Sequence, residues 1–370
     1  MSSNSLVPAP IANLPWRLIL VVAAIGVFGT LVQYSAAGAS MRPWAMPHAV
    51  RFSAFLGMAI MMSYMRPEWF KEAAFPAYAV VLILLILVEA LGFIGGGAQR
   101  WLNLGIITIQ PSELMKLVIV LTIARFYDLL PSGEIRGWTA LWPAGALIGI
   151  PAALILIQPD LGTASMVVFG GLAVMFLAGL PLRIFVGGLA AVTVLVPIAY
   201  SFLHDYQQRR VTIFLDPEAD PLGAGYHISQ SKIAIGSGGL FGKGFLNGTQ
   251  SHLDYLPEGH TDFVFATMAE EWGLAGGLFL IACFFLVIRW GFSVAVETRG
   301  KFERLTAAGL TTTIFFYIAI NLMMVMGLAP VVGIPLPLFS YGGSAMMTVM
   351  ICLGVLMSID RNNRTDPRRR

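Results

Sequence analysis

The chain has 370 residues, of which 57% are hydrophobic and 12% are charged, and its mean hydropathy is +0.77. This apolar content is far above that of a typical soluble domain, which excludes an ordinary soluble protein. The formal net charge of +3 says little by itself about partners, and no nucleic-acid partner is expected.

Apolar runs of about 18 residues or more, long enough to cross a bilayer as a helix, recur along the whole chain. Runs this continuous are too long for the strands of a membrane barrel. The sequence therefore predicts an all-α polytopic membrane protein with a single transmembrane domain over residues 1–370. About ten membrane-spanning helices are expected, at 17–35, 48–65, 76–94, 111–127, 140–157, 162–179, 183–203, 262–288, 304–328 and 341–359.

Lysine and arginine residues between the runs predict the orientation. If residues 1–16 form a cytoplasmic tail, ten spans return the basic tail 360–370 to the cytoplasm, and the cytoplasmic segments then hold most of the positive charge. We therefore expect both termini on the inner side of the cytoplasmic membrane. The first run lacks a usual cleavage site and is interpreted as a retained helix.

Two connections on the external side are long, at 95–113 and 204–261, and long connections are usually functional or disordered. The second contains "YHISQSKIAIGSGGLFGKGF" (226–245), in which apolar and polar residues alternate at helical spacing before a glycine-rich turn. We expect a half-helix here, between the seventh and eighth spans. It should lie back on the bundle, because such backbone is tolerated at membrane depth only where protein covers it or it lines a wet cavity.

Ionisable side chains at the mouth of a span are costly to bury and are therefore candidates for function. The first group is "HTDF" (260–263), with Glu258 just before it. We expect Asp262 in the first turn of the eighth span, where Thr261 could be the N-cap and the helix dipole would favour a charged carboxylate. The alternative is that Asp262 is an ordinary acidic residue at the start of a helix, without a role in a site. His260 and Glu258 are further candidates beside it.

Two groups lie near the fourth and sixth spans. Glu113 and Lys116 are three residues apart, so they share a helix face. They form either a structural ion pair or part of a cavity wall. Arg100 is either an anion contact or an interfacial anchor. Asp160, in "QPDLGTA" (158–164), is either a site residue or part of a turn and helix cap.

Four cations in the long loop lie on the side that should be poor in them: Arg209, Arg210, Lys232 and Lys243. An anionic ligand such as a phosphate or pyrophosphate would explain them, and solvated loop charge is the alternative. The histidines of this loop have no tight metal-site spacing, and both cysteines lie inside predicted spans. A divalent cation, Mg²⁺ or Mn²⁺, held by phosphates and one carboxylate stays open as a cofactor, and no organic cofactor is expected.

Two further features could belong to the same site or be structural. Glu270, in the eighth run, is expected to be a hydrogen-bonded structural acid. Ser340 and Ser344, in "PLPLFSYGGSAMM" (335–347), either line the same cavity as the other candidates or cap the last helix.

Four stretches occur in a fixed order between residues 100 and 347: "RWLNLGIITIQPSELMK", "QPDLGTA", residues 220–276 around "HTDF", and "PLPLFSYGGSAM". This ordered set resembles the SEDS family, named for shape, elongation, division and sporulation. The segment "GTQSHLDYLPE" favours its elongation branch over its division branch.

The resemblance implies a glycosyltransferase that polymerises lipid II into glycan strands on the outer face of the cytoplasmic membrane. It also implies that Asp262 matches the family's essential aspartate and that a class B penicillin-binding protein, with other elongation proteins, is the partner. The β-1,4 product forms from an α-linked donor, so a single displacement needs one base and a cationic group for the leaving pyrophosphate. We expect Asp262 to be that base, with the loop cations and Arg100 near the pyrophosphate.

Three alternatives stay open. The chain could transport a lipid-linked precursor, which would favour paired broken helices in two related halves. It could be a scaffold that activates its transpeptidase without catalysis, or a division-type polymerase. Membrane lipid is an expected partner in each case, because the apolar grooves between spans would hold lipid tails.

Overall fold

The computed structural model describes residues 13–95, 98–103, 108–131, 133–200, 208, 224–253, 255–256 and 258–365. Within these ranges a helix overlaps each of the ten predicted runs. These helices are α2 (Trp16–Ala36), α3 (Met46–Met62), α4 (Pro67–Leu91), α5 (Pro111–Leu129), α6 (Trp138–Ile157), α7 (Leu161–Leu177), α8 (Leu182–Tyr200), α12 (Val264–Glu297), α13 (Lys301–Val325) and α14 (Gly343–Thr365).

Seven helices in the described part of the chain are long and apolar enough to cross a membrane. The two apolar helices α7 and α8 are shorter, and α5 carries four charged side chains within 19 residues. The predicted class, an all-α polytopic membrane protein, is confirmed. The number of ten spans and the orientation stay predictions.

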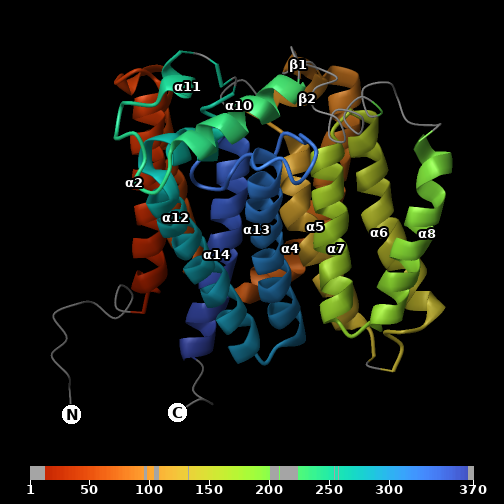
Figure 1. Cartoon of the computed structure of the whole chain (residues 1–370). Helices are drawn as coiled ribbons and strands as arrows, with labels where there is room; N and C mark the ends of the chain where they lie inside the picture. Colours follow the sequence, from red (N-terminus) through yellow and green to blue (C-terminus); the bar gives the residue numbers. More distant parts are fainter. Residues whose placement is uncertain are drawn as a thin grey trace, which may run out of the picture.

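The bundle has two distinct ends (Figure 1). The chain enters α2 and leaves α14 at one end. The opposite end carries a short π-helical turn, η1 (Met41–Ala45), the half-helix α10 (Ala224–Ser237), the short α11 (Thr249–His252) and a small antiparallel sheet. That sheet has the order β1 (Phe93–Gly95), β2 (Ala98–Asn103) and β3 (Thr108–Ile109).

The interior is formed mainly by α5, α13 and α14, in which most side chains are buried. α14 packs on α3, α12 packs on α2 and α13, and α5 packs on α4, α7 and α13. The charged side chains of α5 explain its central place, because ionisable groups in a membrane helix must face protein and not lipid.

The predicted half-helix is confirmed as α10, which crosses the end of the bundle and packs on α12 and α13 (Figure 1). Its 14 residues span only about 21 Å as a helix, too short for a bilayer crossing. Ser231 fixes α10 to the bundle by donating to the carbonyl of Val325 over 2.7 Å.

The eighth run is not the continuous helix that its composition predicts. α12 breaks at Gly273, where φ is 62° and ψ is −160°. The loop that follows α10 fills this break with four backbone hydrogen bonds of 3.0 Å, so the freed backbone groups have partners. They run from Lys243 N to Glu270 O, Gly244 N to Glu271 O, Leu274 N to Gly239 O and Ala275 N to Leu240 O.

Glycine makes this close approach of loop and helix possible. A Cβ added to Gly238 would overlap the carbonyl oxygen of Ala269, and one added to Gly242 would overlap that of Glu271. The glycine-rich stretch after α10 therefore serves backbone packing, and a larger residue at either position would push the loop away from α12.

Candidate functional site

The HTDF segment (260–263) forms a tight turn in front of α12. The helix begins at Val264, with Phe263 at the N-cap position and no side chain bonding the free amides. The carbonyl of Glu258 accepts bonds from the N–H groups of Thr261 and Phe263, which closes the turn. The predicted N-cap role of Thr261 is therefore wrong, because its hydroxyl is used inside the turn and donates to the Glu258 carboxylate over 2.6 Å.

Asp262 is partly buried and lies just before α12, not in the first helical turn that the sequence predicted. Its carbonyl accepts a hydrogen bond of 2.9 Å from Nδ2 of Asn321, a fully buried residue of α13. Its carboxylate faces the loop between α13 and α14, since a Cβ added to Gly333 would lie 3.6 Å from Oδ2. Gly333 has a φ of 70°, which favours glycine, so the backbone beside the carboxylate stays bare.

His260 is held from three other elements. Its ring stacks on Trp44 of η1 with centroids 4.1 Å apart and planes at 8°, and it lies 6.1 Å from the ring of Tyr341. Its carbonyl accepts from Nε2 of Gln33 on α2, over 2.8 Å, and from the N–H of Tyr341, over 2.9 Å. Burial lowers the pKa of His260 below its ordinary value, and the negative charge of Glu258 opposes this shift. The imidazole is therefore neutral at neutral pH.

Arg51 of α3 extends this stack, with its guanidinium carbon 4.9 Å from the centre of the Tyr341 ring. No carboxylate in the described part of the chain forms an ion pair with it. Sequence reasoning missed Arg51, although its place inside the second apolar run (48–65) was a signal, because charge within a span is a functional candidate.

Arg100 and Asp160 meet at the turn between α6 and α7. Arg100 donates through Nε to the carbonyl of Gln158 over 2.9 Å, donates also to the carbonyl of Pro159, and lies 4.0 Å from the Asp160 carboxylate. Asp160 caps α7 by accepting from the N–H of Thr163 over 3.0 Å. Both side chains thus satisfy the backbone of helix ends, as the cap alternative predicted for Asp160.

Glu113 and Lys116 form a fully buried ion pair with Nζ and Oε1 2.6 Å apart. Tyr317 of α13 donates its hydroxyl to the other carboxylate oxygen over 2.5 Å, and the Lys116 ammonium lies 4.4 Å from the centre of that ring. The pair is neutralised and hydrogen-bonded within the bundle, and it joins α5 to α13.

The loop cations differ in their surroundings. Lys243 donates to the Glu270 carboxylate over 2.6 Å and to the Thr249 hydroxyl over 2.7 Å, so its charge is paired inside the protein. Lys232 is exposed on α10. Arg209 and Arg210 lie outside the described residues.

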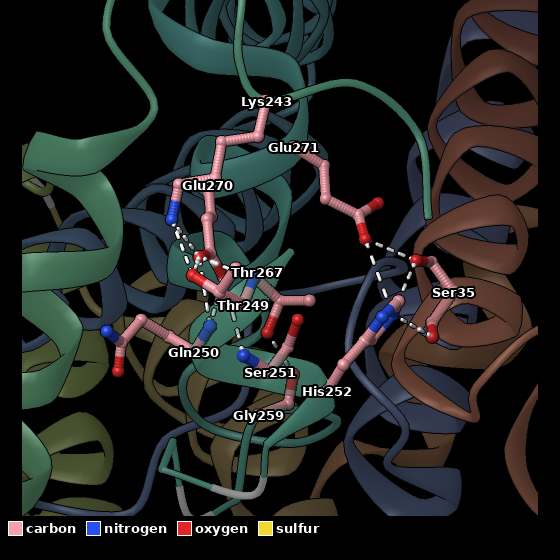
Figure 2. A network of polar contacts seen from close by, with 10 residues as sticks. All are labelled: Ser35, Lys243, Thr249, Gln250, Ser251, His252, Gly259, Thr267, Glu270 and Glu271. Atoms are coloured by element: carbon pink, nitrogen blue, oxygen red, sulfur yellow. Dashed lines mark hydrogen bonds and ion pairs between the residues drawn. The ribbon is translucent and has the colours of Figure 1, made fainter. Parts of the chain in front are cut away.

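Glu270 is a buried, hydrogen-bonded acid, as expected (Figure 2). Its carboxylate accepts from the backbone N–H groups of Thr249, Gln250 and Ser251 at 2.8 to 3.4 Å. These are the free amides at the start of α11, where negative charge is favoured. Together with Lys243, Glu270 ties the end of the external loop to α12.

Glu271, the next residue of α12, links α12 to α2 (Figure 2). It accepts from the hydroxyl of Ser35 and lies 3.7 Å from Nε2 of His252. The same nitrogen is 3.0 Å from the carbonyl of Ser35. Because one ring nitrogen faces all these oxygens, the three side chains form a structural contact and not a relay for a nucleophile.

Ser340 and Ser344 do not share one role. The hydroxyl of Ser340 accepts from the N–H of Leu336 over 2.8 Å and stabilises the loop before α14, whereas Ser344 is buried in the first turn of α14. No group of three or more His, Cys, Asp or Glu side chains that could hold a metal ion occurs among the described residues.

This arrangement places a carboxylate, a neutral imidazole and a cation at one end of the bundle, in Asp262, His260 and Arg51. A fixed carboxylate can accept the proton of an attacking hydroxyl, and a cation can stabilise an anionic leaving group. Side chains of these three kinds can therefore support a reaction in which a hydroxyl attacks and an anionic group leaves.

Comparisons with known proteins agree on the relationship. A family model described as "Cell cycle protein", which groups FtsW, RodA and SpoVE, matches residues 15–365. The chain is 46% identical to the peptidoglycan glycosyltransferase MrdB of Escherichia coli over 352 residues, which are 94% of this chain and 93% of that protein.

Two solved structures are similar over almost the whole chain. One comes from work on the structural coordination of polymerization and crosslinking by a peptidoglycan synthase complex, with a TM-score of 0.83, 33% identity, and coverage of 95% of this chain and 99% of that one. The other is the rod shape determining protein RodA of Thermus thermophilus, with a TM-score of 0.70, 30% identity, and coverage of 95% and 98%.

Proposed function

This chain belongs to the FtsW, RodA and SpoVE family of cell cycle proteins, and on that premise we propose how its site works. It is a multi-pass membrane protein with peptidoglycan glycosyltransferase activity of the RodA type. The proposal is that Asp262 is the base, that lipid II is the substrate, and that the reaction takes place at the end of the bundle that carries α10.

The observation that carries the proposal is the position of Asp262. Its carboxylate is partly buried at the end of the bundle, beside the bare backbone of Gly333. Lipid II carries its sugar α-linked to undecaprenyl pyrophosphate, and a β-1,4 product requires one inversion at the anomeric carbon. A single base must therefore take the proton of the acceptor 4-hydroxyl, and pyrophosphate leaves without a general acid.

The leaving pyrophosphate needs positive charge. Arg51 and Lys232 support this role, because neither forms an ion pair within the described residues. Arg209 and Arg210 stay candidates, whereas Arg100 and Lys243 are bonded within the protein. The described residues contain no cluster of carboxylate, histidine and cysteine side chains that could hold a metal ion by itself. If a divalent cation assists, the pyrophosphate and one site carboxylate would therefore hold the cation, and the cation would supply further positive charge.

The site should face the outside of the cytoplasmic membrane, where lipid II presents its sugar. A class B penicillin-binding protein is the proposed partner, because a structure of a peptidoglycan synthase complex that joins polymerization to crosslinking contains a similar chain. Other elongation proteins would join this pair, and the grooves between the helices would hold the lipid tails.

Labelled lipid II given to the purified protein, with and without its transpeptidase partner, tests the proposal. The wild type should form glycan ladders on a gel, and Asp262→Asn should form none while it stays folded and bound to its partner. The control Glu258→Gln changes the neighbouring carboxylate and should keep most of the activity. Ladders from Asp262→Asn would move the base elsewhere, and no ladders from the folded wild type with its partner would favour transport or scaffolding.

A further inference from the structure

Two uncharged side chains hold the turn that contains Asp262, and neither stands out in the sequence. Nε2 of Gln33 donates to the carbonyls of His260, over 2.8 Å, and Phe339, over 3.4 Å. Nδ2 of Asn321 donates to the carbonyls of Asp262, over 2.9 Å, and Ile334, over 2.7 Å. Each carboxamide therefore joins one residue of the turn to one residue of the loop before α14.

The orientation of both carboxamides is fixed by chemistry. All four partners are backbone carbonyl oxygens, which only accept hydrogen bonds, so the amino group of each side chain must face them. Both side chains are fully buried, and the oxygens Oε1 of Gln33 and Oδ1 of Asn321 have no hydrogen-bond partner among the described residues. A buried oxygen without a partner costs stability. A carboxamide at each position therefore carries this cost for the sake of the hydrogen bonds of its amino group, which points to a role for those bonds beyond packing.

The two residues come from helices that flank the turn on different sides, α2 and α13. Asn321 is the more direct of the two, because it binds the backbone of Asp262 itself. Its second acceptor, Ile334, follows Gly333, whose backbone lies beside the Asp262 carboxylate. The amino group of Asn321 thus joins the backbone of Asp262 to the loop segment that the Asp262 carboxylate faces.

We propose that Gln33 and Asn321 are positioning residues that hold Asp262 in place for catalysis, with Asn321 the stronger. This inference rests on the proposed function, in which Asp262 is the base. Displacement of a reacting group by about 1 Å can lower the rate about 100-fold. We therefore expect a loss in kcat, with little change in KM for lipid II, when either amino group is removed.

The test compares three variants on one helix, each with the transpeptidase partner and labelled lipid II. Asn321→Leu keeps the approximate size and removes both hydrogen bonds, so kcat should fall about 100-fold. Thr311→Val is the control, because Thr311 is buried on α13 and its hydroxyl bonds, within the described residues, only to the carbonyl of Ala307 on its own helix. It should keep the activity of the wild type.

The third variant, Asn321→Asp, separates positioning from general damage. A protonated carboxyl at this site can still donate one hydrogen bond, whereas a carboxylate would repel both carbonyls. Its kcat relative to the wild type should therefore fall as the pH rises, and the same ratio for Asn321→Leu should not change with pH. Wild-type kcat in folded Asn321→Leu, or equal pH profiles for the two variants, would overturn the proposal.

Amide hydrogen exchange provides a measurement that does not depend on activity. The N–H groups of Phe263 and Tyr341, which bond to Glu258 O and His260 O, should exchange faster in Asn321→Leu than in Thr311→Val. Exchange at Thr249 and Gln250, which Glu270 binds, should be unchanged in both. If the wild type formed no glycan, the proposed function would fail, and the exchange rates would still decide whether the carboxamides hold the turn.

Discussion

The ring and the carbonyl of His260 both hold the HTDF turn against neighbouring elements. The ring lies flat on Trp44, and the carbonyl accepts bonds from Gln33 and Tyr341, so this residue joins α2, η1 and the loop before α14. A stacked, partly buried imidazole favours its neutral form, and burial accordingly lowers the pKa of His260. His260 thus positions the turn next to Asp262 without adding a charge to it.

The lowered pKa of His260 makes stability depend on pH. In the unfolded chain this imidazole takes up a proton near pH 6.5, while the folded protein resists protonation until a lower pH. Stability is therefore fully present above about pH 6.5 and falls as the pH drops toward the folded pKa, by at most about 1.4 kcal/mol per pH unit for one proton. Thermal melts of wild type and His260→Phe in detergent should diverge below pH 6.5, because phenylalanine keeps the stack without titrating. Parallel melts down to pH 5 would show that His260 does not titrate as described.

Sequence patterns located the charged residues of this site and missed those that hold it. Asp262 and His260 follow from charge at the mouth of an apolar run. Gln33 and Asn321 carry no charge. Gln33 binds the carbonyl of His260, 227 residues away, and Asn321 binds the carbonyl of Asp262, 59 residues away, and no local sequence pattern reports such contacts. The possible N-cap role of Thr261 was wrong for a related reason, since Glu258 closes a turn before the helix starts.

At the scale of elements, apolar length predicted the helices and could not predict the break in α12. The break at Gly273 exists because the loop after α10 supplies partners for the freed backbone groups, and this loop lies outside the apolar run itself. Glu270 and Lys243 reinforce this junction from the side (Figure 2). The loop, α11 and the upper part of α12 therefore form one structural unit.

Substitution of single glycines tests this unit. Gly242→Ala should displace the loop, because the added methyl group would overlap the carbonyl of Glu271 and the φ of 79° disfavours alanine. We expect faster amide exchange over 238–253 and a loss of glycan synthesis of about tenfold or more, since a loss of about 1.4 kcal/mol in positioning the loop corresponds to tenfold. The control is Gly236→Ala, whose methyl group would meet no atom within 4 Å and would favour the α10 helix. Equal exchange in the two variants would contradict a docked loop.

At the scale of the whole molecule, the two ends of the bundle differ in chemistry. The α10 and α11 region occupies one end, and the chain enters α2 and leaves α14 at the other (Figure 1). Asp262 and His260 lie in the turn before α12, and His260 stacks on Trp44 of η1 at the first end. A polymerase for an external lipid-linked sugar must place the first end outside the cell. The excess of lysine and arginine in the connections at the second end predicts the same orientation, because positive segments stay in the cytoplasm.

Labelling of single cysteines in intact cells decides the orientation. In a background with Cys283→Ala and Cys352→Ala, which removes the two buried native thiols, Ser237→Cys at the end of α10 should react with a membrane-impermeant maleimide. Thr365→Cys at the end of α14 should react only after the membrane is permeabilised. Both positions are exposed, so access to the thiol and not burial sets the result. The reverse pattern would place Asp262 in the cytoplasm, where it could not use a substrate presented on the outer face, and would overturn the proposed site of glycan synthesis while leaving the fold intact.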